Sequence, residues 1–461
     1  MPMRTPIWTA AILASSIAAC ATGPGGETVS SDTPPSPPPP PVIAAEPAPE
    51  AIVVTGAKRD ARADTEVSGT IAADELSTPL PLSEFETNPD AQAGLLTAGD
   101  YDDVLNPELY KRYVDKMLQG ELAGKDLPFI DADRRISISV IDSIGEPIPL
   151  SKIALRDANG SPMFPLKTGA DGMAYLYPHY DALSEGMSIT VSVDGQPPLS
   201  RTLSSQSLRE GGAVEFQFAG NAASVQQLDL LLTLDATGSM SDEMAYLQVE
   251  LVAILDRLRD SHPQLDIRAG FIVYRDKGDA YIVRETAFTN SLVDFKAEFE
   301  KQSSQGGGDF PEAMHDALAA GLNFEWREEA IKINLLVADA PPHDEDISAT
   351  WDSALISRSR GIHIAPIAAS GVDKTAEFLM RGMAQLTASR YMFLTDDSGI
   401  GNAHAEPTVD CYVVTRLDHL VLRVLEDLVM GTRIEPNKDE VIRQTGDYQN
   451  GKCLLNPPET Q

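Results

Sequence analysis

The sequence predicts an α/β protein whose doubly wound, mostly parallel, Rossmann-like sheet follows a small β-sandwich and a disordered linker. Three changes of pattern along the 461 residues support this prediction. From residue 226 onward, apolar strands alternate with amphipathic helices, which is typical of a parallel sheet covered on both faces. Residues 131–222 instead show short period-two strands separated by Asn-Gly and Asp-Gly turns. Residues 20–84 are rich in proline, which favours an extended, semi-rigid chain.

Residues 1–19 have the pattern of a signal peptide. A weakly basic start precedes an apolar run, Ile7 to Ala19, that is too short to span a bilayer. The run ends in Ile17-Ala18-Ala19-Cys20, which resembles a bacterial lipobox, and that resemblance implies cleavage before Cys20 and a lipid anchor on it. The alternative is an ordinary signal peptide followed by an incidental cysteine. The lipobox interpretation places the protein in the cell envelope, and Ala21 favours the outer membrane, facing either the periplasm or the exterior.

Residues 85–130 are predicted to contain a polar turn over 96–103 and a short helix. Apolar residues recur at helical spacing, namely Leu105, Leu109, Tyr110, Tyr113, Met117 and Leu118. Asp102 and Asp103 are interpreted as charges at the N-terminus of this helix, with a metal-binding role as the alternative.

The sandwich of residues 131–222 is expected to have strands near 136–142, 153–158, 173–177 and 189–193, and it resembles immunoglobulin-like and carboxypeptidase-regulatory-like modules. The α/β domain is predicted over 226–430. Its first strand ends at Asp235, a helix follows from Met244, and a closing helix spans 417–428. Residues 431–461 are polar and are predicted to be a C-terminal tail.

The charge balance excludes one class of partner. Asp and Glu number 69 against 36 Lys and Arg, which gives a net charge of −33. Nucleic-acid binding needs a basic face, so the sequence predicts no nucleic-acid partner.

An oxygen-rich motif lies where the first strand of the α/β domain ends. Leu228 to Leu234 are mostly apolar, and Asp235-Ala236-Thr237-Gly238-Ser239 follows immediately before a helix. Loops at the carboxyl ends of parallel strands are where open α/β sheets bind ligands. One carboxylate and two hydroxyls are hard donors, the kind that Mg²⁺, Mn²⁺ or Ca²⁺ prefers. We therefore expect a divalent cation at Asp235, Thr237 and Ser239.

This motif and three downstream segments resemble a bacterial branch of von Willebrand factor type A (VWA) domains. The segments are Tyr274–Asp279, Gly306–Ala313 and Leu335–His343. The motif is similar to the family's metal-ion-dependent adhesion site (MIDAS), Asp-x-Ser-x-Ser. The resemblance implies that Asp339, at the end of another apolar strand, is a further metal ligand. A capping role before Pro341 is the alternative for Asp339.

One loop departs from the family pattern. Integrin-like members supply a threonine where this chain has Phe310, which cannot bind a cation. Asp309 is the substitute ligand that we expect, with Gly306, Gly307 and Gly308 allowing a close approach. The alternative is a tight turn in which Asp309 caps the next helix.

Cys411 and Cys453 are the two cysteines besides Cys20. In an oxidising compartment they could form one disulfide, and the alternative is two separate thiols.

The resemblance implies a non-enzymatic, lipid-anchored protein that binds an unidentified envelope or extracellular protein through the metal. The sequence leaves two alternatives: an Mg²⁺-dependent hydrolase or phosphoesterase, and a scaffold whose metal is purely structural.

Overall fold

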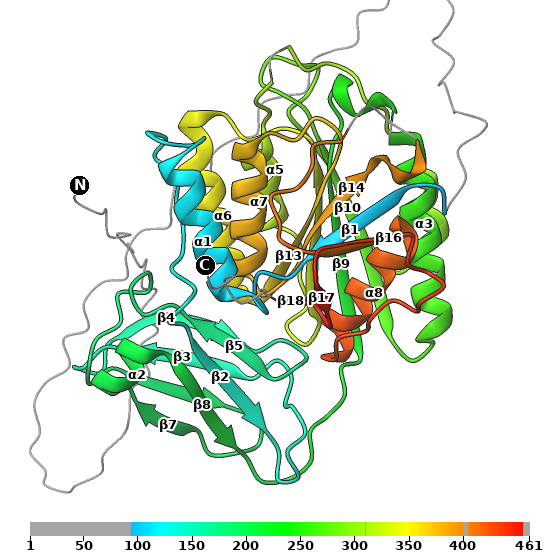
Figure 1. Cartoon of the computed structure of the whole chain (residues 1–461). Coiled ribbons are helices and arrows are strands. Elements are labelled where there is room, and N and C mark those ends of the chain that lie inside the picture. The colour runs from blue at the N-terminus through cyan, green and yellow to red at the C-terminus, as the bar shows by residue number, and fades with distance from the viewer. Residues whose placement is uncertain (1–93, 243, 309, 400–403, 455–461) are drawn as a thin grey trace, which may run out of the picture. The chain divides into compact units, whose positions relative to one another are not determined.

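The computed structural model describes residues 94–242, 244–308, 310–399 and 404–454, which lie in one compact unit, 85–461. The predicted signal peptide, Cys20, the proline-rich linker and Asp309 lie outside the described residues. Two β structures make up the described part: a large mixed sheet with helices on both faces, and a small β-sandwich (Figure 1).

The large sheet has nine strands, and its centre is parallel. In spatial order they are β11 (Val283–Thr289), β10 (Asp266–Tyr274), β9 (Gln227–Asp235), β12 (Ile331–Ala338), β13 (Ile362–Ala368), β14 (Tyr391–Thr395), β1 (Thr97–Tyr101), β15 (Tyr412–Arg416) and β16 (Arg443–Thr445). The five strands from β10 to β14 pair in parallel. Strands β9, β12 and β13 are buried along nearly their whole length, as expected of parallel strands covered on both faces.

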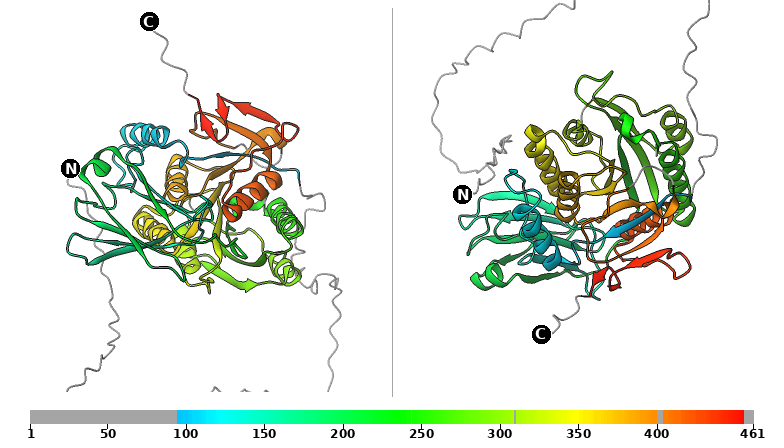
Figure 2. Two further views of the ribbon diagram at one scale, coloured as in Figure 1. Left: turned by 90° about the horizontal axis from the view of Figure 1, so that it is seen from below. Right: turned by 45° about the horizontal axis from the view of Figure 1, so that its top comes forward.

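Helices pack on both faces of this sheet (Figure 1). One face carries α3 (Met244–Ser261), α4 (Leu292–Phe299) and α8 (Leu417–Met430). The other carries α1 (Pro107–Gln119), α5 (Met314–Gly321), α6 (Ile347–Arg360) and α7 (Lys374–Leu386). Side chains of β9 alternate between the two cores, since Leu230 and Leu232 face the first and Leu231 the second. The doubly wound α/β prediction is therefore confirmed, and the turned views of Figure 2 show the same layering.

The sandwich has one sheet of three strands and one of four around a separate apolar core. The strands are β5 (Met173–Leu176), β2 (Ile136–Ile141) and β8 (Gly212–Gln217) in the first sheet, and β4 (Pro162–Lys167), β3 (Lys152–Arg156), β6 (Ser188–Ser192) and β7 (Leu199–Thr202) in the second. A short helix, α2 (Ser205–Glu210), precedes β8. The sandwich contacts α6 through a buried ion pair in which Arg358 Nη1 lies 2.7 Å from Asp181 Oδ1.

Segments on both sides of the predicted domain limits of 226–430 contribute strands to the large sheet. The predicted polar turn over 96–103 is instead strand β1, between β14 and β15. The predicted tail contributes β16 as an edge strand and a hairpin of β17 (Tyr448–Gln449) and β18 (Lys452–Cys453). Both segments are polar, and this local polarity predicts a turn and a tail. In the structure their charges are paired with residues distant in the sequence, which allows both segments to join the fold. None of the described helices is long and apolar enough to cross a membrane.

Candidate metal centre

Parallel pairing brings the two predicted aspartates to the same edge of the sheet. Strand β9 ends at Asp235, and β12 ends one residue before Asp339. The two strands are neighbours, with Leu234 opposite Val337. Both carboxylates are buried, Asp235 fully and Asp339 to 2% exposure. The structure therefore brings together the two strand ends that the sequence singled out.

The loop after β9 folds back on its own aspartate. Asp235 Oδ1 accepts hydrogen bonds from the backbone N–H of Thr237 at 2.9 Å and from its hydroxyl at 2.6 Å. The hydroxyls of Thr237 and Ser239 are 3.1 Å apart. Thr237 is buried while Ser239 is exposed, so the three oxygen-bearing residues run from the sheet edge to solvent.

The glycine-rich loop lies directly against this motif. The N–H of Gly238 donates to the carbonyl of Gly306 at 3.0 Å, and the N–H of Gln305 donates to the carbonyl of Ala236, also at 3.0 Å. Gly306 and Gly307 have φ values of +82° and +73°, in the left-handed region that favours glycine. A Cβ on Gly307 would lie 2.9 Å from Glu312 Oε1 and 3.1 Å from Thr237 Cβ. The close approach expected of these glycines is present, although Asp309 itself is outside the described residues.

Glu312 is a site residue that the sequence analysis missed. Its side chain is only 3% exposed, and its backbone N–H donates to the Pro341 carbonyl at 2.9 Å, next to the Asp339 loop. Within the described residues no group donates a hydrogen bond to Glu312 Oε2. Its position in the sequence, two residues after Phe310, gives no sign of burial, which arises from the packing of three loops. The signal available in the sequence was a second carboxylate in the same glycine-rich loop.

Electrostatics show that these carboxylates repel one another. Burial, and then the charge of Asp339, raises the pKa of Asp235 to about 7. Burial raises the pKa of Glu312 to about 9, with further repulsion from Asp235, Asp276 and Asp339. Among the described residues, neither Asp235 nor Glu312 has a Lys, Arg or His in an ion pair. Such a cluster requires protons or a cation to offset its charge.

The loop after β10 braces the site without joining the predicted ligand set. Arg275 donates from Nε to the Ala236 carbonyl at 3.1 Å and from Nη2 to the Ser303 carbonyl at 2.8 Å. Asp276 Oδ1 lies 2.6 Å from His343 Nε2. Asp279 Oδ2 accepts the N–H of Gly307 at 2.9 Å. These contacts fix the glycine loop and the Asp339 loop against the motif.

The residues present fit a hard divalent cation. The donor set combines carboxylates with hydroxyls, the chemistry that Mg²⁺, Mn²⁺ and Ca²⁺ prefer, and Glu312 Oε2 is a buried oxygen without a protein donor. Among the described residues no group of three or more His, Cys, Asp and Glu side chains could hold a metal by itself. A cation here would depend on the Thr237 and Ser239 hydroxyls as well as on carboxylates.

The other predicted positions lie away from this edge. Asp102 pairs with Arg433 at 2.9 Å, and Asp103 pairs with Arg381 at 2.6 Å. Both carboxylates therefore form ion pairs that stabilise the segment after β1. Cys411 and Cys453 are joined by a disulfide, which is the first of the two arrangements that the sequence left open. The predicted closing helix, α8, begins without a side-chain cap: Arg416 is the N-cap residue and makes no side-chain cap hydrogen bond, while Asp418 pairs with Arg257.

A match to a known protein family agrees with this arrangement. The family model described as von Willebrand factor A domain matches residues 229–403. The chain is 31% identical over 127 residues to "Alpha-protein kinase vwkA" of Dictyostelium discoideum, which covers 27% of this chain and 20% of that protein. It thus spans about a fifth of that relative's length. A crystal structure of the conserved hypothetical protein BatB from Bacteroides thetaiotaomicron is similar at 12% identity and a TM-score of 0.30, over 44% of this chain and 98% of that one. The family match, the doubly wound sheet and the motif at its edge identify a von Willebrand factor type A domain at residues 229–403 of this chain.

Proposed function

We propose that this protein binds one divalent cation at Asp235, Thr237, Ser239, Asp309 and Asp339, and holds a partner protein through that metal face. The observation that carries the proposal is the packing of the Asp235–Ser239 loop against the glycine-rich loop and the end of β12. This packing gathers hydroxyls and mutually repelling carboxylates at one sheet edge. VWA domains in general mediate protein–protein interaction and are usually non-enzymatic, which favours binding over catalysis.

Each residue has a distinct proposed part. Asp235 Oδ1 already holds the Thr237 hydroxyl, so the carboxylate orients that hydroxyl oxygen toward the cation. Ser239 is exposed, which leaves one side of the site open to solvent and to an oxygen ligand from a partner. Glu312, buried against the same loops, adds negative charge close to the cation. A bound cation would supply positive charge next to Asp235 and Glu312, neither of which has a basic side chain in an ion pair among the described residues.

The test is calorimetric titration of Mg²⁺ and Mn²⁺ into the parent protein, Thr237→Ala and the matched control Ser241→Ala. Ser241 is exposed and lies two residues beyond Ser239. We expect at least a tenfold loss of affinity in Thr237→Ala, on the scale of about 1.4 kcal/mol for each factor of ten, and no change in Ser241→Ala. Equal affinities in all three proteins would remove Thr237 from the site.

Partner binding is tested by removing the metal. Circular dichroism and capture from envelope extract are measured on one sample before and after EDTA. The proposal expects that the fold persists and capture is lost. Capture that survives EDTA would place the binding surface elsewhere. Unfolding in EDTA would support the alternative of a purely structural metal, and metal-dependent release of phosphate from an ester would support the hydrolase alternative.

Attachment to the cell envelope is a separate part of the proposal and rests on the lipobox-like sequence ending at Cys20. Metabolic labelling with a radioactive fatty acid and membrane fractionation should both depend on Cys20. A Cys20→Ser protein that pellets with membranes as before would show that Cys20 is not the anchor.

A further inference from the structure

Strand β1 fills a gap in the middle of the large sheet. It pairs in antiparallel fashion with β14 through Thr97 to Tyr101 and with β15 through Thr97 to Gly99. Within the described chain β14 and β15 do not pair directly, since β1 separates them. Without β1, two edges with unpaired N–H and C=O groups would face each other in the interior of the protein.

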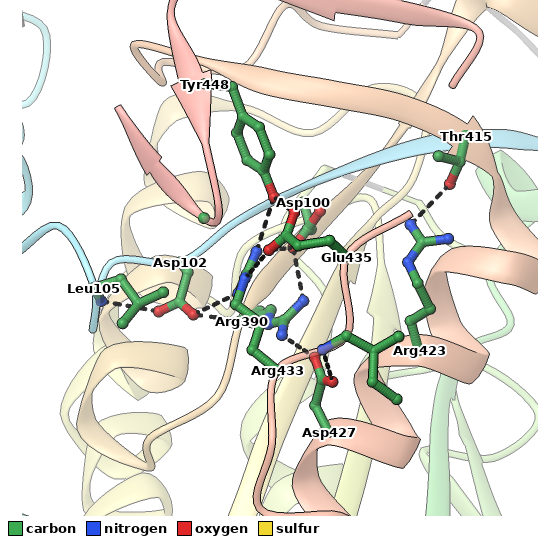
Figure 3. A network of polar contacts seen from close by, with 12 residues as sticks. Asp100, Asp102, Leu105, Arg390, Thr415, Arg423, Asp427, Arg433, Glu435 and Tyr448 are labelled. Carbon is green, nitrogen blue, oxygen red and sulfur yellow. Dashed lines mark hydrogen bonds and ion pairs between the residues drawn. The ribbon is translucent and has the colours of Figure 1, made fainter. Parts of the chain in front are cut away.

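The gap accepts only a strand with a particular set of side chains. At Gly99 a Cβ would lie 2.7 Å from Phe393 Cζ and 3.1 Å from Tyr412 Cδ2, so a glycine is needed there. Asp100 next to it is 3% exposed and lies 3.2 Å from Arg390 Nη1 and 3.6 Å from Arg433 Nη2. Figure 3 shows the guanidiniums of Arg390 and Arg433 close to Asp100.

Two further acidic residues of the same segment have buried or half-buried basic partners. Asp102 lies 2.9 Å from Arg433 Nη1 and 3.7 Å from Arg390 Nε (Figure 3). Asp103 receives two hydrogen bonds from Arg381, at 2.9 and 2.6 Å, and both side chains are only 1% exposed. Each arginine also has an anion outside the strand, since Arg390 pairs with Asp427, Arg433 with Glu435 and Arg381 with Glu377. The aspartates of the strand supply further negative charge, so an uncharged strand in the gap would leave these guanidiniums less well compensated.

The segment is also held at its beginning. Glu250 of α3 is fully buried, and its Oε1 accepts the backbone N–H groups of Gly94, Leu95 and Leu96 at 2.8, 3.1 and 3.3 Å. Leu417 donates its N–H to the Leu96 carbonyl at 2.8 Å. These contacts come from residues more than 150 positions away, as in the binding of a separate peptide.

We propose that the groove between β14 and β15 is a strand-binding site for an extended acidic peptide with the pattern Gly-Asp-Tyr-Asp-Asp, occupied by residues 94–119 of the same chain. The segment has the character of a bound ligand: backbone pairing supplies affinity, and the glycine and the three aspartates supply specificity. Of the strands concerned, β14 lies within the family match at 229–403, whereas β1 and β15 lie outside it. This inference does not depend on the proposed metal function.

The exposed turn after α1 allows a test on the full chain. Gly124 is exposed, has φ +89° and has no neighbouring atom within 4 Å of a Cβ placed there, so a site for a specific protease can be inserted after it. The disulfide joins two residues on the C-terminal side of the cut, so no covalent bond would retain the N-terminal fragment. After cleavage we expect both fragments to co-elute on gel filtration and to separate only in denaturant. Release of the N-terminal fragment from a core that stays folded would overturn the proposal.

A second measurement isolates the specificity. The cleaved protein is unfolded in denaturant, the N-terminal fragment is removed, and the remaining chain is refolded with a fluorescent peptide of residues 94–119. Dissociation of this peptide is followed by anisotropy. An Asp103→Asn peptide should dissociate at least about tenfold faster than the parent peptide, because it loses a charged, buried hydrogen-bond pair. Asp115→Asn, on the exposed face of α1, is the matched control and should behave as the parent. Equal dissociation of the Asp103→Asn and parent peptides would refute the acidic specificity.

Discussion

Replacing Gly307 by alanine should destabilise the protein and weaken Mg²⁺ binding at the candidate metal centre. Comparison with an alanine at Gly308 shows how much of this effect comes from the contact between the two site loops. Gly307 has φ +73°, where a residue with a side chain pays about 1 kcal/mol or more. Its Cβ would also approach Glu312 Oε1 at 2.9 Å and Thr237 Cβ at 3.1 Å, so the two site loops must move apart. Together these effects should destabilise Gly307→Ala by about 1–3 kcal/mol.

Gly308 provides the matched control, since a Cβ there meets no atom within 4 Å and its φ lies outside the strained region. Thermal unfolding followed by circular dichroism should show a midpoint lower by several degrees in Gly307→Ala and nearly unchanged in Gly308→Ala, at roughly 2–4 °C per kcal/mol. Calorimetry should show weaker Mg²⁺ binding in Gly307→Ala alone. If the two variants match each other in both measurements, the glycine loop does not pack on the motif as described.

Three further predictions concern the stability of the fold. Glu250→Ala should lower the free energy of unfolding by about 2–4 kcal/mol in urea, because three backbone N–H groups lose their acceptor, and Glu250→Gln, which keeps a carbonyl oxygen, should lose less. Replacing Cys411 and Cys453 by serine should cost about 4 kcal/mol in the chain-entropy model for a separation of 42 residues, and an unchanged urea midpoint would contradict it. Burial lowers the pKa of Lys332 to about 8, so the unfolded chain binds more protons than the folded chain between about pH 8 and 10.5, and the free energy of unfolding should rise with pH in that range. Lys332→Met should remove this rise. Parallel pH profiles of unfolding for the two proteins would refute the prediction.

Sequence pattern was sufficient for the centre of the sheet because parallel strands buried on both faces are nearly continuous apolar runs. Strands β9, β12 and β13 are of this kind. The predicted ends of two of them, β9 at Asp235 and β12 beside Asp339, agree with the structure. The aspartates that end β9 and follow β12 were also predicted to meet, since carboxyl ends of neighbouring parallel strands share one edge.

Prediction from sequence pattern was wrong where a polar segment is buried through contacts with residues distant in the sequence. The sequence Thr-Ala-Gly-Asp-Tyr has the composition of a turn, yet it forms β1 in the interior of the sheet. Its charges are matched by Arg390 and Arg433, some 290 and 330 residues further along the chain, and no local periodicity reports such distant pairs. The C-terminal segment, predicted as a tail, is likewise polar by itself and forms β16 by pairing with β15.

The candidate site divides along the same line. The sequence alone determined which oxygen donors lie at the candidate site, because the spacing of Asp235, Thr237 and Ser239 places their oxygens on one short loop after a strand. Only the tertiary structure added Glu312, and only it showed that Gly306 and Gly307 let that loop touch the motif. The physical reason is that donor chemistry is a property of single residues, whereas burial and repulsion among carboxylates exist only once separate loops have been brought together by the sheet.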